Sequence, residues 1–189
     1  MESIYQNIHQ DLIDRCKEND KSAQFSIYKL YYKAMFNSAY RILKNETDAE
    51  DIMQESFLKA FKKIDTYRGE VTFGVWLKRI VVNRSLDELR KKKEHFSELN
   101  DGVTSDLTDD STSNEPFNYS IDEVKWAINQ LADGYRVVLN LFLIEGYDHE
   151  EIASILNISN STSRSQYLRA KRKLRELLLN KKAKTIALN

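Results

Sequence analysis

The chain has 189 residues with a formal net charge of zero, and one proline, five glycines and many Leu, Lys, Glu, Ala and Ile residues predict an all-α protein. Cys16 is the single cysteine, which excludes a disulfide framework and a CxxC metal site. The first twenty residues lack the apolar core of a signal peptide, and no run reaches the roughly eighteen apolar residues of a membrane helix. We therefore expect a cytoplasmic protein with no membrane insertion of its own.

The first half of the chain is predicted to be helical almost throughout, because apolar residues recur at three- and four-residue spacings over residues 11–93. Asn45 is expected to end one helix, and Thr47 or Asp48 to cap the next. The apolar stripe of that next helix consists of Ala49, Met53, Phe57, Ala60, Phe61 and Ile64, with Ile52 at its edge. This stripe predicts that the opposite, acidic face of the helix is free to meet a partner.

A loop with two glycines is expected at residues 65–74, followed by a helix over residues 75–93. Tyr67 and Phe73 lie in this loop beside Arg68, and aromatic rings next to cations are suited to hold unpaired bases. The alternative is that the rings fill the small core.

The helix over residues 75–93 carries seven Lys or Arg residues between 76 and 93 against two acidic ones. Asn83, Arg84 and Asp87 fall on the side of its apolar stripe when the helix is plotted from Ile80. They could therefore form a buried polar network and not touch DNA. Arg79 and Arg90 lie at the flank, and we expect them to be better placed for phosphates.

Residues 94–119 have no sustained apolar period and are rich in Ser, Thr, Asp and Asn, which predicts a flexible acidic linker. Nine acidic residues and no Lys or Arg occur over residues 94–123. A second helical block is expected from Ser120 to about Asn180. The sequence thus predicts two small helical domains, over residues 1–93 and 120–189.

The second domain contains the pattern of a helix-turn-helix. Asp148 with Glu151 three residues later is a capping arrangement that starts a short helix. Asn157 can adopt the left-handed conformation that ends it, and Ser159 can cap the next helix. The alternative is an ordinary amphipathic terminal helix with a solvated basic face.

The second helix of this motif has one mainly apolar face, predicted to contain Ser163, Tyr167, Ala170, Leu174, Leu177 and Leu178. The opposite face and its flank carry hydroxyl and guanidinium groups, which suit a DNA major groove and its phosphates. The residues predicted to contact DNA are Ser161, Arg164, Ser165, Leu168, Arg169 and Arg172.

The chain resembles extracytoplasmic-function (ECF) sigma factors, the small promoter-recognition subunits of bacterial RNA polymerase. The likeness to their core-binding domain lies in AYRILKNETDAEDIMQESFLKAFKKIDTYRG and in FGVWLKRIVVNRSLDELRKKK, and that to their −35-binding domain in EGYDHEEIASILNISNSTSRSQYLRAKRKLREL. It covers about residues 10–93 and 120–179. It implies a sigma factor that binds core polymerase and directs initiation at promoters with −10 and −35 elements.

The resemblance also implies partners and sites. The first domain would be sigma region 2 and the second region 4, whose six DNA-binding residues would read the −35 element. The helix that docks on the β′ clamp helices would use Asp48, Glu50, Asp51, Gln54 and Glu55. Contacts with the −10 element would come from Tyr67, Arg68, Phe73, Arg79, Asn83 and Arg90. The β subunit and a cognate anti-sigma factor are further expected partners.

Three positions depart from the family pattern. The usual Leu-Pro before the first helix of the C-terminal domain is Leu131-Ala132 here, which predicts a less rigid entry to that helix. Ser163 stands where a valine is common, which weakens the core slightly, and Gln166 stands where an arginine is frequent, which removes one expected DNA contact.

The sequence leaves two other classes of function open. Asp48, Asp51 and Glu55, with Asp87 elsewhere, could hold Mg²⁺ in an all-α nucleotide pyrophosphohydrolase. Such a site needs a second helix with paired carboxylates, for which Asp87 and Glu88 are a weak candidate, and the sequence contains no HExxH and no P-loop. We therefore expect no enzyme activity, metal or cofactor. A free-standing helix-turn-helix regulator would require a dimer and a palindromic site. Co-purification with core polymerase would separate these readings.

Overall fold

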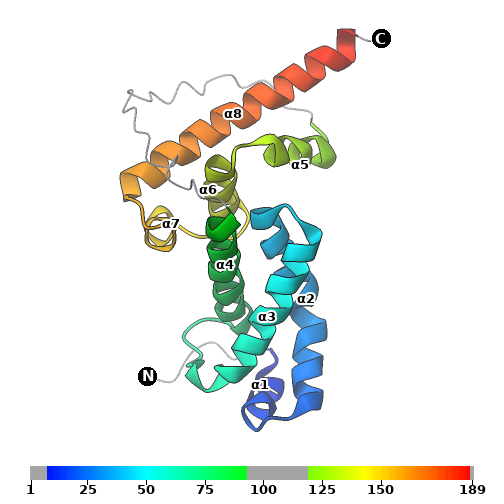
Figure 1. The fold of residues 1–189 in the computed structure, drawn as a ribbon, viewed down its shortest axis with the longest axis vertical. Coiled ribbons are helices and arrows are strands. Elements are labelled where there is room, and N and C mark those ends of the chain that lie inside the picture. The colour runs from blue at the N-terminus through cyan, green and yellow to red at the C-terminus, as the bar shows by residue number, and fades with distance from the viewer. Residues whose placement is uncertain (1–7, 93–118, 188–189) are drawn as a thin grey trace. The chain divides into compact units, whose positions relative to one another are not determined.

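The computed structural model describes residues 8–92 and 119–187. Within these two ranges it contains eight α-helices, one short 3-10 helix and no strand, which confirms the all-α prediction (Figure 1). The chain divides into two compact units, Met1–Glu94 and His95–Asn189, called here the N-terminal and the C-terminal unit. Residues 94–118 of the predicted linker lie outside the described residues.

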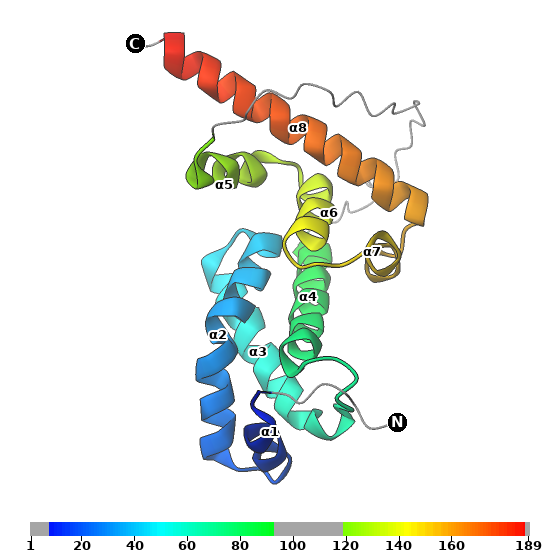
Figure 2. The same ribbon diagram turned by 180° about the vertical axis from the view of Figure 1, so that it is seen from behind.

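The N-terminal unit consists of α1 (Gln10–Lys17), α2 (Lys21–Leu43), α3 (Glu46–Lys62), η1 (Ile64–Thr66) and α4 (Phe73–Lys92). The helices α2, α3 and α4 pack against one another in all three pairs, and α1 packs on α2 and η1 (Figures 1 and 2). The apolar stripe predicted for α3 lies in the core, since Ala49, Met53, Phe57 and Ala60 are almost completely buried.

The junction between α2 and α3 differs from the prediction. Lys44 adopts the left-handed conformation (φ 57°) and ends α2, and the side chain of Asn45 then accepts a hydrogen bond from the Asp48 amide at 3.0 Å. Asn45 is therefore the N-cap of α3, and the prediction that Thr47 or Asp48 caps it is wrong. Because Lys44 already reverses the chain, α3 can start two or three residues earlier than expected.

The helix α4 also begins earlier than expected, at Phe73 instead of residue 75. Gly74 lies in its first turn, and a Cβ atom there would stand 3.1 Å from Cε1 of Tyr31 on α2. This glycine allows close approach of two helices, so it does not mark a loop.

The C-terminal unit consists of α5 (Ile121–Gln130), α6 (Asp133–Leu143), α7 (His149–Leu156) and α8 (Asn160–Ala187). The long helix α8 packs against each of the other three (Figure 2). The core of the C-terminal unit contains Leu131, Leu139 and Ala170, and Arg136 is a buried cation in the same unit. Arg136 forms an ion pair with Asp133, and burial lowers the pKa of its guanidinium to about 10.

The helix boundaries of the C-terminal unit follow the predicted signals. Ser120 and Asp148 each form a capping box, at the starts of α5 and α7. Asn157 ends α7 in the left-handed conformation (φ 57°), and the Ser159 hydroxyl accepts a hydrogen bond from the Thr162 amide at 3.0 Å. These contacts confirm the predicted helix-turn-helix. None of the helices described is both long and apolar enough to cross a membrane.

Candidate nucleic-acid interface

The helix α8 has one buried face and one exposed face, as the helical wheel predicts. Ser163 and Ala170 are completely buried, whereas Ser161, Arg164 and Arg172 are exposed. Ser165, Leu168 and Arg169 are half-buried. The six residues predicted to contact DNA therefore lie together along residues 161–172, a length of about 18 Å at 1.5 Å per residue.

Local hydrogen bonds hold the first turn of this surface. Nε of Arg164 donates to Oδ1 of Asn160 at 2.8 Å, and the Ser165 hydroxyl donates to the carbonyl oxygen of Thr162 at 3.0 Å. The hydroxyls of Ser161 and Ser159 lie 2.8 Å apart. A guanidinium has five N–H donors. Arg164 thus keeps donors for a further acceptor while its stem is held.

One residue that the sequence did not single out for this motif is His149, the first residue of α7. Its Nδ1 lies 2.9 Å from the hydroxyl of Ser163 on the buried face of α8. The pKa of His149 is lowered by burial and by the nearby Arg164, while Asp148 opposes the shift. No local spacing pattern predicts a pair separated by fourteen residues.

Tyr67, in the loop between η1 and α4, and Phe73, the first residue of α4, both place their rings in the core. Tyr67 is 5% exposed and Phe73 is 1% exposed, with ring centroids 5.5 Å apart at right angles. The Tyr67 hydroxyl donates to the carbonyl oxygen of Val71 at 2.7 Å and so closes the loop. Arg68 is exposed. The burial of both rings supports the alternative in which they fill the core.

The polar residues of α4 lie differently from the wheel plotted from Ile80. The helix α4 packs against both α2 and α3, and its buried residues are Phe73, Leu77, Val81, Val82, Ser85, Leu86 and Leu89. Asn83 is exposed, and the side chain of Asp87 is 64% exposed. These two residues therefore do not form the buried polar network that the sequence left open, since the buried residues of α4 include Val81 and Ser85 and not Asn83 or Asp87. Arg79 is also exposed.

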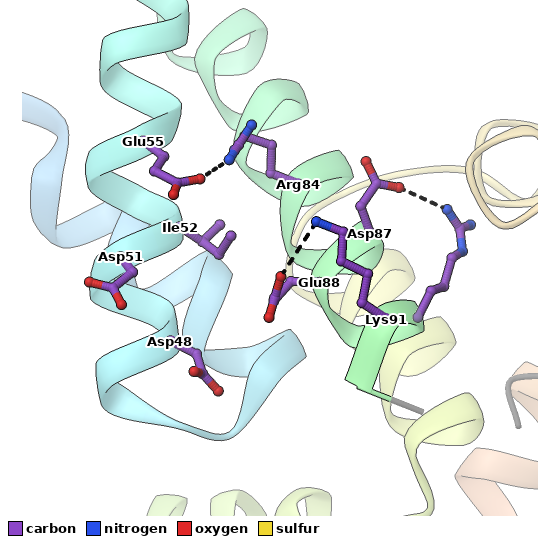
Figure 3. A pocket seen from close by; sticks show the side chains of 9 residues that line it. Asp48, Asp51, Ile52, Glu55, Arg84, Asp87, Glu88 and Lys91 are labelled. Carbon is purple, nitrogen blue, oxygen red and sulfur yellow. Dashed lines mark hydrogen bonds and ion pairs between the residues drawn. The ribbon is translucent and has the colours of Figure 1, made fainter. Parts of the chain in front are cut away.

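A polar groove of about 540 Å³ runs between α3 and α4 (Figure 3). It is lined by Asp48, Asp51, Ile52, Glu55, Arg84, Asp87, Glu88, Arg90 and Lys91. Glu55 on α3 forms an ion pair with Arg84 on α4, and Arg90 lies 3.2 Å from Asp87 on its own helix. Nζ of Lys92 lies 2.5 Å from Asp48, a hydrogen bond that raises the pKa of the lysine.

The groove brings Asp48, Asp51 and Glu55 of the predicted polymerase-binding set together with one predicted −10 residue, Arg90. Asp51 is exposed, and Glu50 and Gln54 are joined by a hydrogen bond of 3.2 Å. Asp48 and Glu55 are engaged by cations of α4, so the α3 face is only partly free. These ion pairs between α3 and α4 could not be predicted from the sequence, because their cations belong to a separate helix.

The carboxylates of the groove do not form a metal site. In the part of the chain that the structure describes, no group of three or more His, Cys, Asp or Glu side chains could hold a metal ion. The acidic residues alternate with cations instead, which gives the pyrophosphohydrolase alternative no support.

Comparison with known proteins gives matches over both units. The family model of Sigma-70 region 2 matches residues 27–95, and that of Sigma-70 region 4 matches residues 121–174. The chain is 32% identical over 176 residues to the ECF RNA polymerase sigma factor SigW of Bacillus subtilis, covering 88% of this chain and 94% of the relative. It is 30% identical to the ECF RNA polymerase sigma-E factor of Haemophilus influenzae, with 91% and 94% covered.

Solved structures show the same fold. The sigma factor RpoE of Bartonella quintana, solved in complex with the anti-sigma factor NepR, aligns with a TM-score of 0.55 and 26% identity. The alignment covers 81% of this chain and 94% of that one. CnrH, solved in complex with the cytosolic domain of CnrY, also aligns with a TM-score of 0.55, at 24% identity, over 90% of this chain and 96% of that one.

Proposed function

The chain belongs to the extracytoplasmic-function sigma factors of the sigma-70 family, and from this membership we infer how its two units work. It is an initiation factor and not an enzyme. It binds core RNA polymerase and directs promoter-specific transcription initiation through −10 and −35 elements. Its further partner is an anti-sigma factor, as for the RpoE relative. We propose that it acts in the cytoplasm, where polymerase and promoter DNA are found.

The observation that carries the −35 assignment is the capped helix-turn-helix with a hydroxyl and guanidinium surface on α8. Ser161, Arg164 and Arg172 are exposed on one face, while Ser163 and Ala170 fix the other in the core. An α-helix of this kind fits the major groove, where arginine can read guanine bidentately and neighbouring groups hold phosphates. We assign residues 120–189 to sigma region 4 on this basis.

We assign residues 1–93 to sigma region 2, which contacts the −10 element. The residues predicted for this contact have different roles. Arg68, Arg79 and Asn83 are exposed, and we propose that they contact promoter DNA directly together with Arg90. Tyr67 and Phe73 are buried, so we propose that they hold the loop in shape. A base that enters this loop would stack on them only after local opening.

The polymerase contact is proposed for the exposed carboxylates and amide of α3. Glu50, Asp51 and Gln54 are exposed on one side of the helix, while Met53 and Phe57 anchor its other side in the core. An acidic surface on a rigid helix suits a basic partner helix. Residues 94–119 would then span from this polymerase-bound unit to the −35 unit.

Reconstitution tests the function. The full chain is mixed with core RNA polymerase, co-purified, and used for run-off transcription from DNA upstream of its own gene. We expect a one-to-one complex and a defined transcript that core polymerase alone does not give. A free-standing regulator would instead bind a palindromic duplex as a dimer and would not co-purify. That result would contradict the proposed function.

A further inference from the structure

Three aromatic rings and one hydroxyl join the three helices of the helix-turn-helix. His149 at the start of α7 stacks on Phe142 of α6, with centroids 4.5 Å apart and planes inclined by 18°. Tyr167 of α8 packs against both rings, at 4.5 Å from Phe142 and 5.6 Å from His149. The hydrogen bond between His149 and the completely buried Ser163 closes the cluster.

The cluster touches α8 directly beneath its proposed DNA surface. Ser163 immediately precedes Arg164, and Arg164 and Ser165 both belong to that surface. A side chain lies roughly 5 Å from the helix axis, so a 20° rotation of α8 would move it by about 2 Å. Such a shift exceeds the tolerance of a hydrogen bond to a base edge. The rotation of α8 about its axis therefore has to be fixed.

We propose that His149 is the positioning residue of the recognition helix, and that its neutral imidazole fixes the rotation of α8 through Ser163 and the ring cluster. Base specificity at the −35 element then depends on a residue that need not touch a base. The inference rests on the proposed function, because specificity requires that α8 reads DNA.

The surroundings of His149 favour its neutral form. From α8, Arg164 repels a charged imidazole and lowers its pKa, and Lys171 lies 5.7 Å from the Tyr167 ring. On the α6 side the ring stacks on the uncharged Phe142. Asp148, the N-cap of its own helix, acts in the opposite direction but less strongly than burial.

The lowered pKa gives the cluster a defined pH dependence. The unfolded chain takes up a proton on this histidine near pH 6.5, before the folded chain does. The stabilising contribution of the neutral ring is therefore complete above about pH 6.5 and is lost as pH falls through the folded pKa. Acidification should loosen α8 while its arginines keep their charge.

The test uses the full chain in complex with core polymerase. A −35 sequence is first selected by the wild-type complex from a duplex pool randomised at that element. The ratio of affinities for the selected and a scrambled −35 duplex is then measured at pH 7.5 and at a pH below the midpoint of the His149 titration, which NMR of the free chain supplies. Two variants are compared with wild type: His149→Ala, and His149→Phe combined with Ser163→Val, which replaces the polar contact by an apolar one.

We expect His149→Ala to lower the specificity ratio at least tenfold at pH 7.5 with an unchanged salt slope, because the phosphate contacts persist. The double variant should keep the ratio and lose the decrease that wild type shows below the midpoint of the His149 titration. In the NMR spectrum of the free chain, the ring signal that disappears in the double variant should titrate below its position in the urea-unfolded chain.

Other outcomes overturn the proposal. An unchanged ratio in His149→Ala would show that the residue does not position α8. If that variant fails to fold, the double variant becomes the test. A pH dependence of the specificity ratio equal to that of wild type in the double variant would show that groups other than His149 and Ser163 cause it, and would contradict the proposal. If the wild-type complex selects no −35 sequence, the proposed function itself fails, and this inference fails with it.

Discussion

Ser163 shows how a single position can depart from a family pattern without loss of packing. A buried hydroxyl without a partner costs free energy, on the order of 1–3 kcal/mol from protein mutational data. Here the hydroxyl is completely buried but bonded to His149. The weakening of the core expected from the missing valine is thus offset by a polar contact between α7 and α8. Gln166, at the position of a frequent arginine, is buried as well.

Substitution of Arg169 or Arg172 by alanine tests the DNA face residue by residue. We expect each variant to bind the upstream promoter duplex more weakly, by about 1–3 kcal/mol where the guanidinium reads a base edge bidentately. If the contact is to phosphate, the salt slope should fall by about one. Binding of the polymerase complex to promoter duplex at several salt concentrations measures both quantities.

A matched control for these arginines is Lys173→Ala, which removes the same charge from the same helix. The amine of Lys173 is engaged with Glu176 at 2.9 Å, so this variant should bind DNA almost as wild type does. If Arg169→Ala and Arg172→Ala both transcribe as wild type, the DNA-facing side of α8 has been assigned wrongly.

At the scale of elements, local capping signals and apolar faces were predictable, whereas contacts between residues far apart in the sequence were not. The Asp148 cap and the left-handed Asn157 follow from residues within one or two turns, and the structure confirms both. The start of α4 depends on Gly74 lying against Tyr31, and Tyr31 belongs to a helix more than forty residues earlier. The second apolar stripe of this helix, Val82, Leu86 and Leu89, does indicate cover on two sides, and α4 packs against both α2 and α3. Long-range contacts such as that of Gly74 with Tyr31 carry no signal in a single sequence.

Substitution of two residues on α3 tests its role as a polymerase-docking helix. The combination Gln54→Ala and Glu55→Arg should abolish co-purification with core polymerase, because it removes an amide and reverses a charge on the proposed surface. The loss should be on the order of 2–4 kcal/mol, the range of interface hot spots. Neither side chain belongs to the apolar stripe, so the circular dichroism spectrum should stay unchanged.

The structure adds a control for this experiment. Glu55 is paired with Arg84, so Glu55→Arg both alters the surface and places two cations together across the groove. Arg84→Ala breaks the same ion pair and leaves the carboxylates of α3 in place. We expect it to retain polymerase binding. Equal loss in both variants would assign the effect to the groove, and retained binding in the first would remove α3 from the docking surface.

At the scale of the whole molecule, a net charge of zero results from segments of opposite sign. Residues 76–93 and 161–189 are basic, and residues 94–123 carry nine acidic residues without any Lys or Arg. The helices supply cations where DNA is expected, and part of this charge in the N-terminal unit is already balanced by carboxylates in the groove between α3 and α4. The sequence of the acidic segment, residues 94–123, contains no Lys or Arg that could balance its carboxylates.

The charge of residues 94–119, most of which lie outside the described part of the chain, can be tested without a change in length. A polymerase channel that holds RNA is lined with cations, so a polyanionic segment could lie in it and be displaced by the growing transcript. Replacement of Asp101, Asp106, Asp109 and Asp110 by Asn removes four charges and keeps the segment polar. We expect initiation to fail at low concentrations of the initiating nucleotide, or the pattern of abortive products to change, while promoter binding persists.

Abortive and full-length products are measured by run-off transcription beside a promoter-binding assay. Identical yields from the neutralised and the wild-type chain would leave the segment as a spacer between the two DNA-binding units.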